Sequence, residues 1–71
     1  MTKLQILAEI EGYDSVDAML EAAAFSGIVP AICTKGVCDY AESLEPDGTC
    51  DCEDCGGVDT VRSCLLIAGL I

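Results

Sequence analysis

Apolar residues at helical spacing open the chain. Thr2 and Gln5 stand three residues apart in the pattern of a capping box, which predicts that a helix begins there. Gly12 suits the end of that helix, because glycine readily adopts the left-handed conformation of a helix C-terminus. Its apolar stripe consists of Leu4, Ile6, Leu7 and Ile10.

A second amphipathic stretch follows directly. Asp14 or Ser15 can cap a second helix, and Asp17 lies in its first turn, where the helix dipole favours an acid. We expect this helix to end at Ser26-Gly27. The side chains predicted to face the core are Val16, Met19, Leu20, Ala23 and Ala24.

The middle of the chain shows weak alternation and turn signals. Ile28–Ile32 contains Pro30 and is expected to be extended. Tyr40–Leu44 alternates in polarity and can pair with Thr49–Cys52. The intervening Glu45–Gly48 combines Pro, Asp and Gly, which predicts a tight turn. The pattern therefore predicts a β-hairpin.

The C-terminal part is apolar almost all round. Asp59 or Thr60 can cap a third helix over Val61–Ala68, although a short strand is the alternative for so short an apolar run. The run Cys64–Ile71 is too short to span a bilayer. We therefore predict a single α+β domain over residues 1–71, with a helical part (1–27), a zinc-ribbon hairpin (28–57) and a C-terminal helix (58–71).

Four of the six cysteines form two closely spaced pairs. Cys33 and Cys38 make C-x4-C, whereas Cys52 and Cys55 make C-x2-C and precede two glycines. Two short loops that each offer a cysteine pair can surround a tetrahedral zinc ion. Nothing in the sequence suggests export, and a cytoplasmic chain keeps its thiols reduced. We predict one Zn²⁺ per chain, with disulfides and an iron centre or cluster as alternatives.

The other two cysteines, Cys50 and Cys64, lie outside these two pairs. Cys64 lies on the apolar face of the predicted C-terminal helix and is expected to be a small buried hydrophobe. Cys50 precedes Cys52 by two residues and is interpreted as a thiol beside the site. It could also exchange with Cys52 as a ligand, or take part in a disulfide or a metal cluster.

The charge of the chain limits its partners. The net charge is −10, with three basic residues and no histidine. Proteins bind nucleic acids mainly by neutralising phosphates with Lys and Arg, so this class of partner is disfavoured. Acidic residues crowd the cysteine loops and form a solvated face, a docking surface for a basic partner or a mimic of nucleic-acid charge. Their field disfavours thiolates in the metal-free chain, which argues against cysteine catalysis.

Several short stretches are similar to a known family. They are 11–15 (EGYDS), 30–33 (PAIC), 38–40 (CDY), 45–47 (EPD), 52–56 (CEDCG) and 60–63 (TVRS). They resemble a family of small uncharacterised bacterial and phage proteins with a four-cysteine zinc-ribbon core. The resemblance implies a zinc site at the two cysteine pairs but no particular activity. Cys50 and Cys64 depart from the family pattern.

The expected function is that of a non-enzymatic, intracellular zinc-binding protein that interacts with another protein. A nucleic-acid-associated ribbon and a rubredoxin-like electron-transfer protein are the alternatives. The apolar tail suggests a homodimer or another protein contact through Leu66, Leu70 and Ile71.

Overall fold

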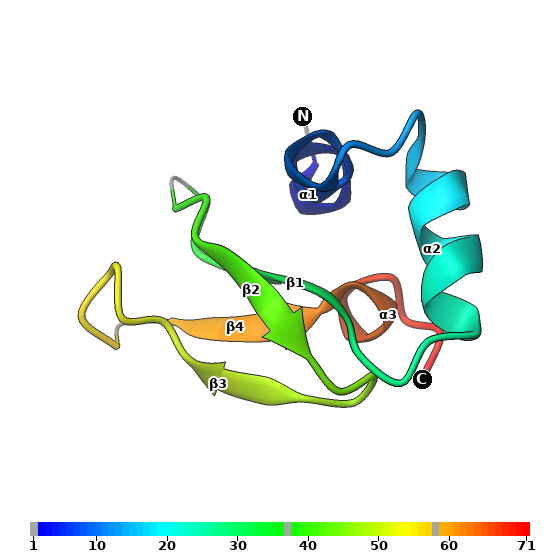
Figure 1. Ribbon diagram of the computed structural model, residues 1–71. Helices are drawn as coiled ribbons and strands as arrows, with labels where there is room; N and C mark the ends of the chain where they lie inside the picture. Colours follow the sequence, from blue (N-terminus) through cyan, green and yellow to red (C-terminus); the bar gives the residue numbers. More distant parts are fainter. Residues whose placement is uncertain (1, 37, 58) are drawn as a thin grey trace.

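The computed structural model describes residues 2–36, 38–57 and 59–71 and shows helices packed on a small sheet (Figure 1). The mixed α+β class agrees with the sequence. The elements are α1 (Lys3–Glu11), α2 (Val16–Ala24), β1 (Val29–Cys33), β2 (Ala41–Leu44), β3 (Thr49–Asp51), β4 (Thr60–Ser63) and α3 (Cys64–Ile67). None of the helices among these residues has the length and apolarity needed to cross a bilayer.

The two N-terminal helices begin where the sequence predicts. The Thr2 side chain accepts a hydrogen bond from the Gln5 N–H at 3.1 Å, and the Gln5 side chain accepts from the Thr2 N–H at 2.8 Å. Gly12 ends α1 with a φ of 81°. Ser15 caps α2 by accepting from the Ala18 N–H at 3.1 Å. The capping box and the Gly12 stop are therefore confirmed.

The four strands form one antiparallel sheet in the order β2-β1-β4-β3. The predicted pairing of Tyr40–Leu44 with Thr49–Cys52 is therefore wrong, because β2 and β3 are the two edges. The apolar, almost fully buried β1 takes the central position and pairs with β2 on one side and β4 on the other. Pro30 fits there because β4 pairs with Ala31–Cys33 only, beyond the residue that lacks an N–H.

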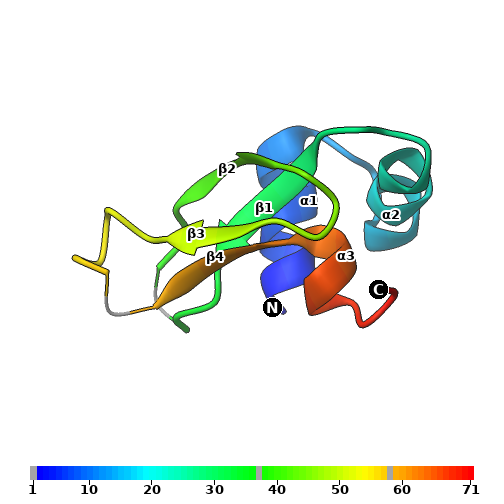
Figure 2. The ribbon, with the colours of Figure 1, turned by 90° about the horizontal axis from the view of Figure 1, so that it is seen from below.

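The predicted turn is present, and it makes the sheet curl. The Gly48 N–H donates to the Glu45 carbonyl at 2.8 Å, so residues 45–48 connect the two edge strands directly. A sheet whose edges are joined by so short a turn must bend toward itself (Figure 2). The buried Ser63 secures this turn, because its hydroxyl donates to the Pro46 carbonyl and its N–H donates to the Gly48 carbonyl at 3.3 Å.

The C-terminal part differs from the predicted helix over Val61–Ala68. Residues Thr60–Ser63 form β4, and only Cys64–Ile67 form the helix α3. The backbone of β4 supplies the partner that both β1 and β3 need, which overrides the apolar pattern. Ser63 caps α3 by accepting from the Leu66 N–H at 3.2 Å, in place of the predicted Asp59 or Thr60.

Buried side chains form two clusters on opposite sides of the sheet. The larger one lies between the helices and the sheet, and contains Leu7, Ala8, Met19, Ala23, Val29, Ile32, Cys64 and Leu65. The smaller one lies inside the curl, and contains Ala31, Cys33, Cys52 and Val61. Ala24, expected to face the core, is exposed. Half of the smaller cluster is cysteine, so its stability depends on the chemistry of those thiols.

Candidate metal centre

The two cysteine pairs meet because β4 lies between the strands that carry them. Cys33 ends β1 and stands opposite Val61 of β4, while Cys50 of β3 stands opposite the same Val61 on the other side. Cys52 follows β3, and its N–H donates to the Asp59 carbonyl at 3.1 Å. The loops after β1 and β3 therefore emerge at the same end of the sheet, away from α2 (Figures 1 and 2).

Each loop turns back on itself and presents a second cysteine. In the first loop, the Cys38 N–H donates to the Lys35 carbonyl at 3.1 Å. In the second loop, the Gly57 N–H donates to the Cys52 carbonyl at 2.8 Å. Gly56 and Gly57 have φ values of 69° and 79°, a conformation that favours glycine. The glycines after Cys55 therefore let the second loop turn tightly.

The four sulfur atoms have the spacing of a tetrahedral metal site. The Sγ atoms of Cys33, Cys38, Cys52 and Cys55 all lie within 4.8 Å of one another. Two of the separations are 4.0 Å (Cys33 to Cys55) and 3.6 Å (Cys38 to Cys52). A tetrahedron with Zn–S bonds of about 2.3 Å has sulfur–sulfur edges of about 3.8 Å. A disulfide requires about 2.05 Å, so these four thiols fit a metal ion and are not bonded to one another.

A polar bridge joins the two loops beside the cysteines. The Thr34 hydroxyl donates to the Asp59 carboxylate at 2.6 Å, and the Thr60 N–H donates to the same oxygen at 2.8 Å. The Thr34 N–H also donates to the Thr60 carbonyl at 3.0 Å. These hydrogen bonds, led by that of Thr34, hold the pKa of Asp59 below its usual value. The bridge is therefore a second link between the two loops, independent of the cysteines.

The four cysteines of the cluster are not equally buried. Cys33 and Cys52 are fully buried, whereas Cys38 and Cys55 are half-buried. Burial raises the pKa of the Cys33 thiol to about 12, and a backbone hydrogen bond from Lys35 offsets only part of this effect. At neutral pH the metal-free Cys33 thus keeps its proton, which a metal must displace. The Lys3 ammonium of α1 donates to the Cys38 carbonyl and brings a positive charge near the site.

A second polar contact beside the cluster was not predicted from the sequence. The Glu42 carboxylate accepts from the Cys50 thiol at 3.2 Å and from the Tyr40 hydroxyl at 2.8 Å. Glu42 lies on β2 and Cys50 on β3, so this contact spans the two edges of the curled sheet. The hydrogen bond to Glu42, together with burial, raises the pKa of Cys50 to about 11, and Glu42 raises that of Tyr40 to about 12. Only the curl brings these residues together, so no local pattern could have shown it.

Cys64 belongs to the other side of the sheet. It is fully buried in the cluster beneath the helices, and burial raises the pKa of its thiol. The expectation that it is a small buried hydrophobe is confirmed.

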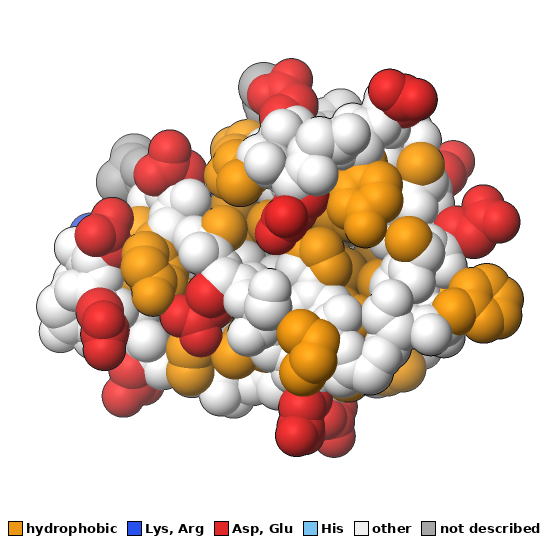
Figure 3. Space-filling model, viewed as in Figure 1, with side chains coloured by type: hydrophobic (Ala, Val, Ile, Leu, Met, Phe, Trp, Pro, Cys, Tyr) orange, Lys and Arg blue, Asp and Glu red, His pale blue; other side chains and the backbone are white. Residues whose placement is uncertain are grey.

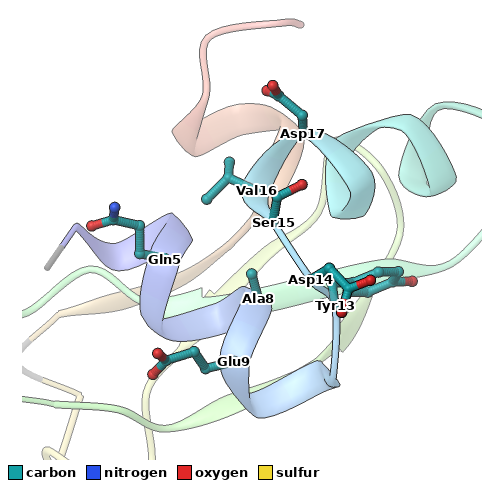
Figure 4. A pocket seen from close by; sticks show the side chains of 8 residues that line it. All are labelled: Gln5, Ala8, Glu9, Tyr13, Asp14, Ser15, Val16 and Asp17. Atoms are coloured by element: carbon teal, nitrogen blue, oxygen red, sulfur yellow. The ribbon is translucent and has the colours of Figure 1, made fainter.

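A surface hollow of about 430 Å³ lies elsewhere, between α1 and the start of α2 (Figure 4). It is lined by Gln5, Ala8, Glu9, Tyr13, Asp14, Ser15, Val16 and Asp17. No cysteine reaches it. The hollow is therefore separate from the four-cysteine cluster.

Carboxylates are the prevailing charged groups on the visible surface. Figure 3 shows Asp and Glu side chains spread over this face, with almost no Lys or Arg. Beside the cysteine loops, Asp39, Asp51, Glu53 and Asp54 are exposed. A metal site here would be surrounded by a negative surface.

Comparisons with known proteins identify no relative. No family model matches the chain, and neither the curated proteins nor the solved structures contain a significant match. The resemblance to the small bacterial and phage family stays a prediction.

Proposed function

We propose that this chain is a non-enzymatic zinc protein of the cytoplasm, in which one Zn²⁺ is held by Cys33, Cys38, Cys52 and Cys55. The observation that supports this proposal is the tetrahedral spacing of the four sulfur atoms. Four thiolates fill the coordination shell of zinc and leave no position for a substrate or an attacking water. Such an ion stabilises a fold and does not act on a ligand.

The ion would stabilise this fold where the apolar core is weakest. Among the residues that the structure describes, the fully buried part of the cluster inside the curl consists of Ala31 and Val61 besides its two cysteines, with the partly buried Tyr40 and Leu44 packed against it. Zinc would replace the missing apolar contacts by bonds that join the ends of β1 and β3. Small domains of this length commonly need such a ligand.

We also propose that the protein acts by binding another protein through its acidic surface. Four thiolates and one Zn²⁺ add a charge of −2 to the −10 of the polypeptide, giving about −12. A basic protein surface fits this charge, whereas a nucleic acid is repelled by it. Fluorescence anisotropy with duplex DNA and with RNA tests the second point. Salt-sensitive micromolar binding would favour a nucleic-acid function instead.

Elemental analysis of purified protein tests the metal proposal. The wild type should contain one zinc per chain. Cys52→Ala should lose most of it, while the matched variant Cys50→Ala, two residues away, should keep it. Equal loss in both variants, or an intramolecular disulfide among the four cysteines after expression in reducing cells, would refute the assignment. Bound iron with visible absorbance would instead support an electron-transfer protein, because tetrahedral thiolates also suit iron.

A further inference from the structure

The chain contains a fifth thiol on the same face of the sheet as the metal cluster. Cys33 and Cys50 both stand opposite Val61, and directly opposed residues in a sheet share a face. Cys50 also packs against the small buried cluster that contains Cys33 and Cys52. It is therefore near the site but outside the set of four sulfur atoms that lie within 4.8 Å of one another.

The sequence allows Cys50 to compete with Cys52. Cys52 and Cys55 form C-x2-C, but Cys50 and Cys55 form C-x4-C, the spacing that Cys33 and Cys38 already use. Cys50 could bind zinc only if its S–H proton left and the displaced Cys52 thiolate took up a proton. A shift of this kind would move the loop that follows β3 by two residues and disturb its hydrogen bond to Asp59. A single folded structure therefore requires that the same thiol, either Cys50 or Cys52, binds the ion in every molecule.

We propose that Glu42 favours Cys52 as the ligand by holding the Cys50 thiol away from the metal. Its carboxylate accepts a hydrogen bond from the Cys50 thiol, with 3.2 Å between Sγ and Oε1, across the two edges of the sheet. Tyr40 donates to the other carboxylate oxygen at 2.8 Å and thereby fixes the orientation of Glu42. Glu42 is a positioning residue, and it acts on the metal site only through Cys50. This inference rests on the proposed zinc site.

Protection of the cysteines from alkylation tests the inference. A short pulse of N-ethylmaleimide is applied to the zinc-loaded protein, and mass spectrometry then locates the modified residues. In the wild type, Cys52 should be protected. In Glu42→Ala, Cys50 is free to replace Cys52, and alkylation of Cys52 should rise about tenfold, the loss expected for one hydrogen bond to a charged group. Tyr40→Phe is the matched control, since it retains the Cys50–Glu42 contact, and it should give a much smaller increase.

The double variant Glu42→Ala/Cys50→Ala tests whether Glu42 acts on the metal site through Cys50 or only stabilises the fold. Without the competing thiol, Cys52 should regain its protection. Unchanged alkylation of Cys52 in Glu42→Ala, or an equal rise in the double variant, would overturn the proposal. If Glu42→Ala does not fold, Glu42→Gln is used, because its amide is a weaker acceptor of the same shape. Zinc content is measured in the same samples: a wild type without zinc would refute the proposed function and this inference with it, whereas a zinc-loaded wild type that fails the alkylation test would refute this inference alone.

Discussion

The strongest test of the metal site compares two cysteines that are equally buried but differ in their predicted function. Cys52 lies in the cluster inside the curl and Cys64 in the cluster beneath the helices, and both have no exposed surface. Replacing either cysteine by alanine removes one buried sulfur atom. The packing cost of this deletion is about 1–2 kcal/mol, similar to the loss of a buried methyl group.

The loss of a metal ligand adds a second cost to Cys52→Ala only. Structural zinc contributes about 10–16 kcal/mol of apparent binding free energy, or about 2.5–4 kcal/mol per thiolate if four share it equally. Cys52→Ala should therefore lower the free energy of unfolding by about 3.5–6 kcal/mol. A domain of 71 residues has a total of about 4–11 kcal/mol, so this variant loses most of its stability. Cys64→Ala should lower the melting temperature by only about 5–15 °C.

Thermal melting followed by circular dichroism measures both effects, first with zinc and then with excess chelator. With zinc, Cys52→Ala should be far less stable than Cys64→Ala. With chelator, the metal-dependent difference should disappear, and the wild type should itself be strongly destabilised. Equal destabilisation of the two variants in the presence of zinc would refute the reasoning, because it would mean that Cys52 contributes only packing.

Three further predictions concern pH, the polar bridge and association. Because Cys33 must lose its proton on binding metal, zinc affinity measured by chelator competition should rise between about pH 6 and pH 8, and a pH-independent affinity would contradict this. The lowered pKa of Asp59 means that its carboxylate stabilises the fold above the unfolded-state pKa and loses this effect as the pH falls through the folded-state pKa. Asp59→Asn should therefore have a lower melting temperature than the wild type at neutral pH, whereas Asp54→Asn, at an exposed position, should not. The difference in melting temperature between Asp59→Asn and the wild type should become smaller below about pH 4. Leu70 and Ile71 are each 60% exposed, so sedimentation equilibrium at micromolar concentration should show self-association that Leu70→Glu weakens without loss of zinc, and a strictly monomeric wild type would exclude the tail as an interface.

Local signals in the sequence were sufficient for the N-terminal helices. The capping box of Thr2 and Gln5 and the glycine at position 12 depend on hydrogen bonds between residues close in the chain. The Glu45–Gly48 turn is equally local and was also predicted correctly. Such features can be predicted because neighbouring residues alone satisfy the backbone groups involved.

The composition of the four-cysteine cluster was also visible in the sequence. The spacing within each pair is a local property, and the glycines after Cys55 mark the tight turn that the second loop makes. The way in which the two pairs meet was not visible. A direct hairpin between Tyr40–Leu44 and Thr49–Cys52 was expected, but β4 brings the pairs together from more distant parts of the chain.

The sequence by itself thus determined the N-terminal caps of α1 and α2, the turn and the identity of the four candidate ligands, because each depends on residues only a few positions apart. The tertiary structure decided the strand order, the division of the C-terminal run into β4 and α3, and the contact of Glu42 with Cys50. These features depend on which strand the buried backbone of β1 selects as its partners. That choice reflects the packing of the whole molecule, and a short apolar segment carries no local signal for it.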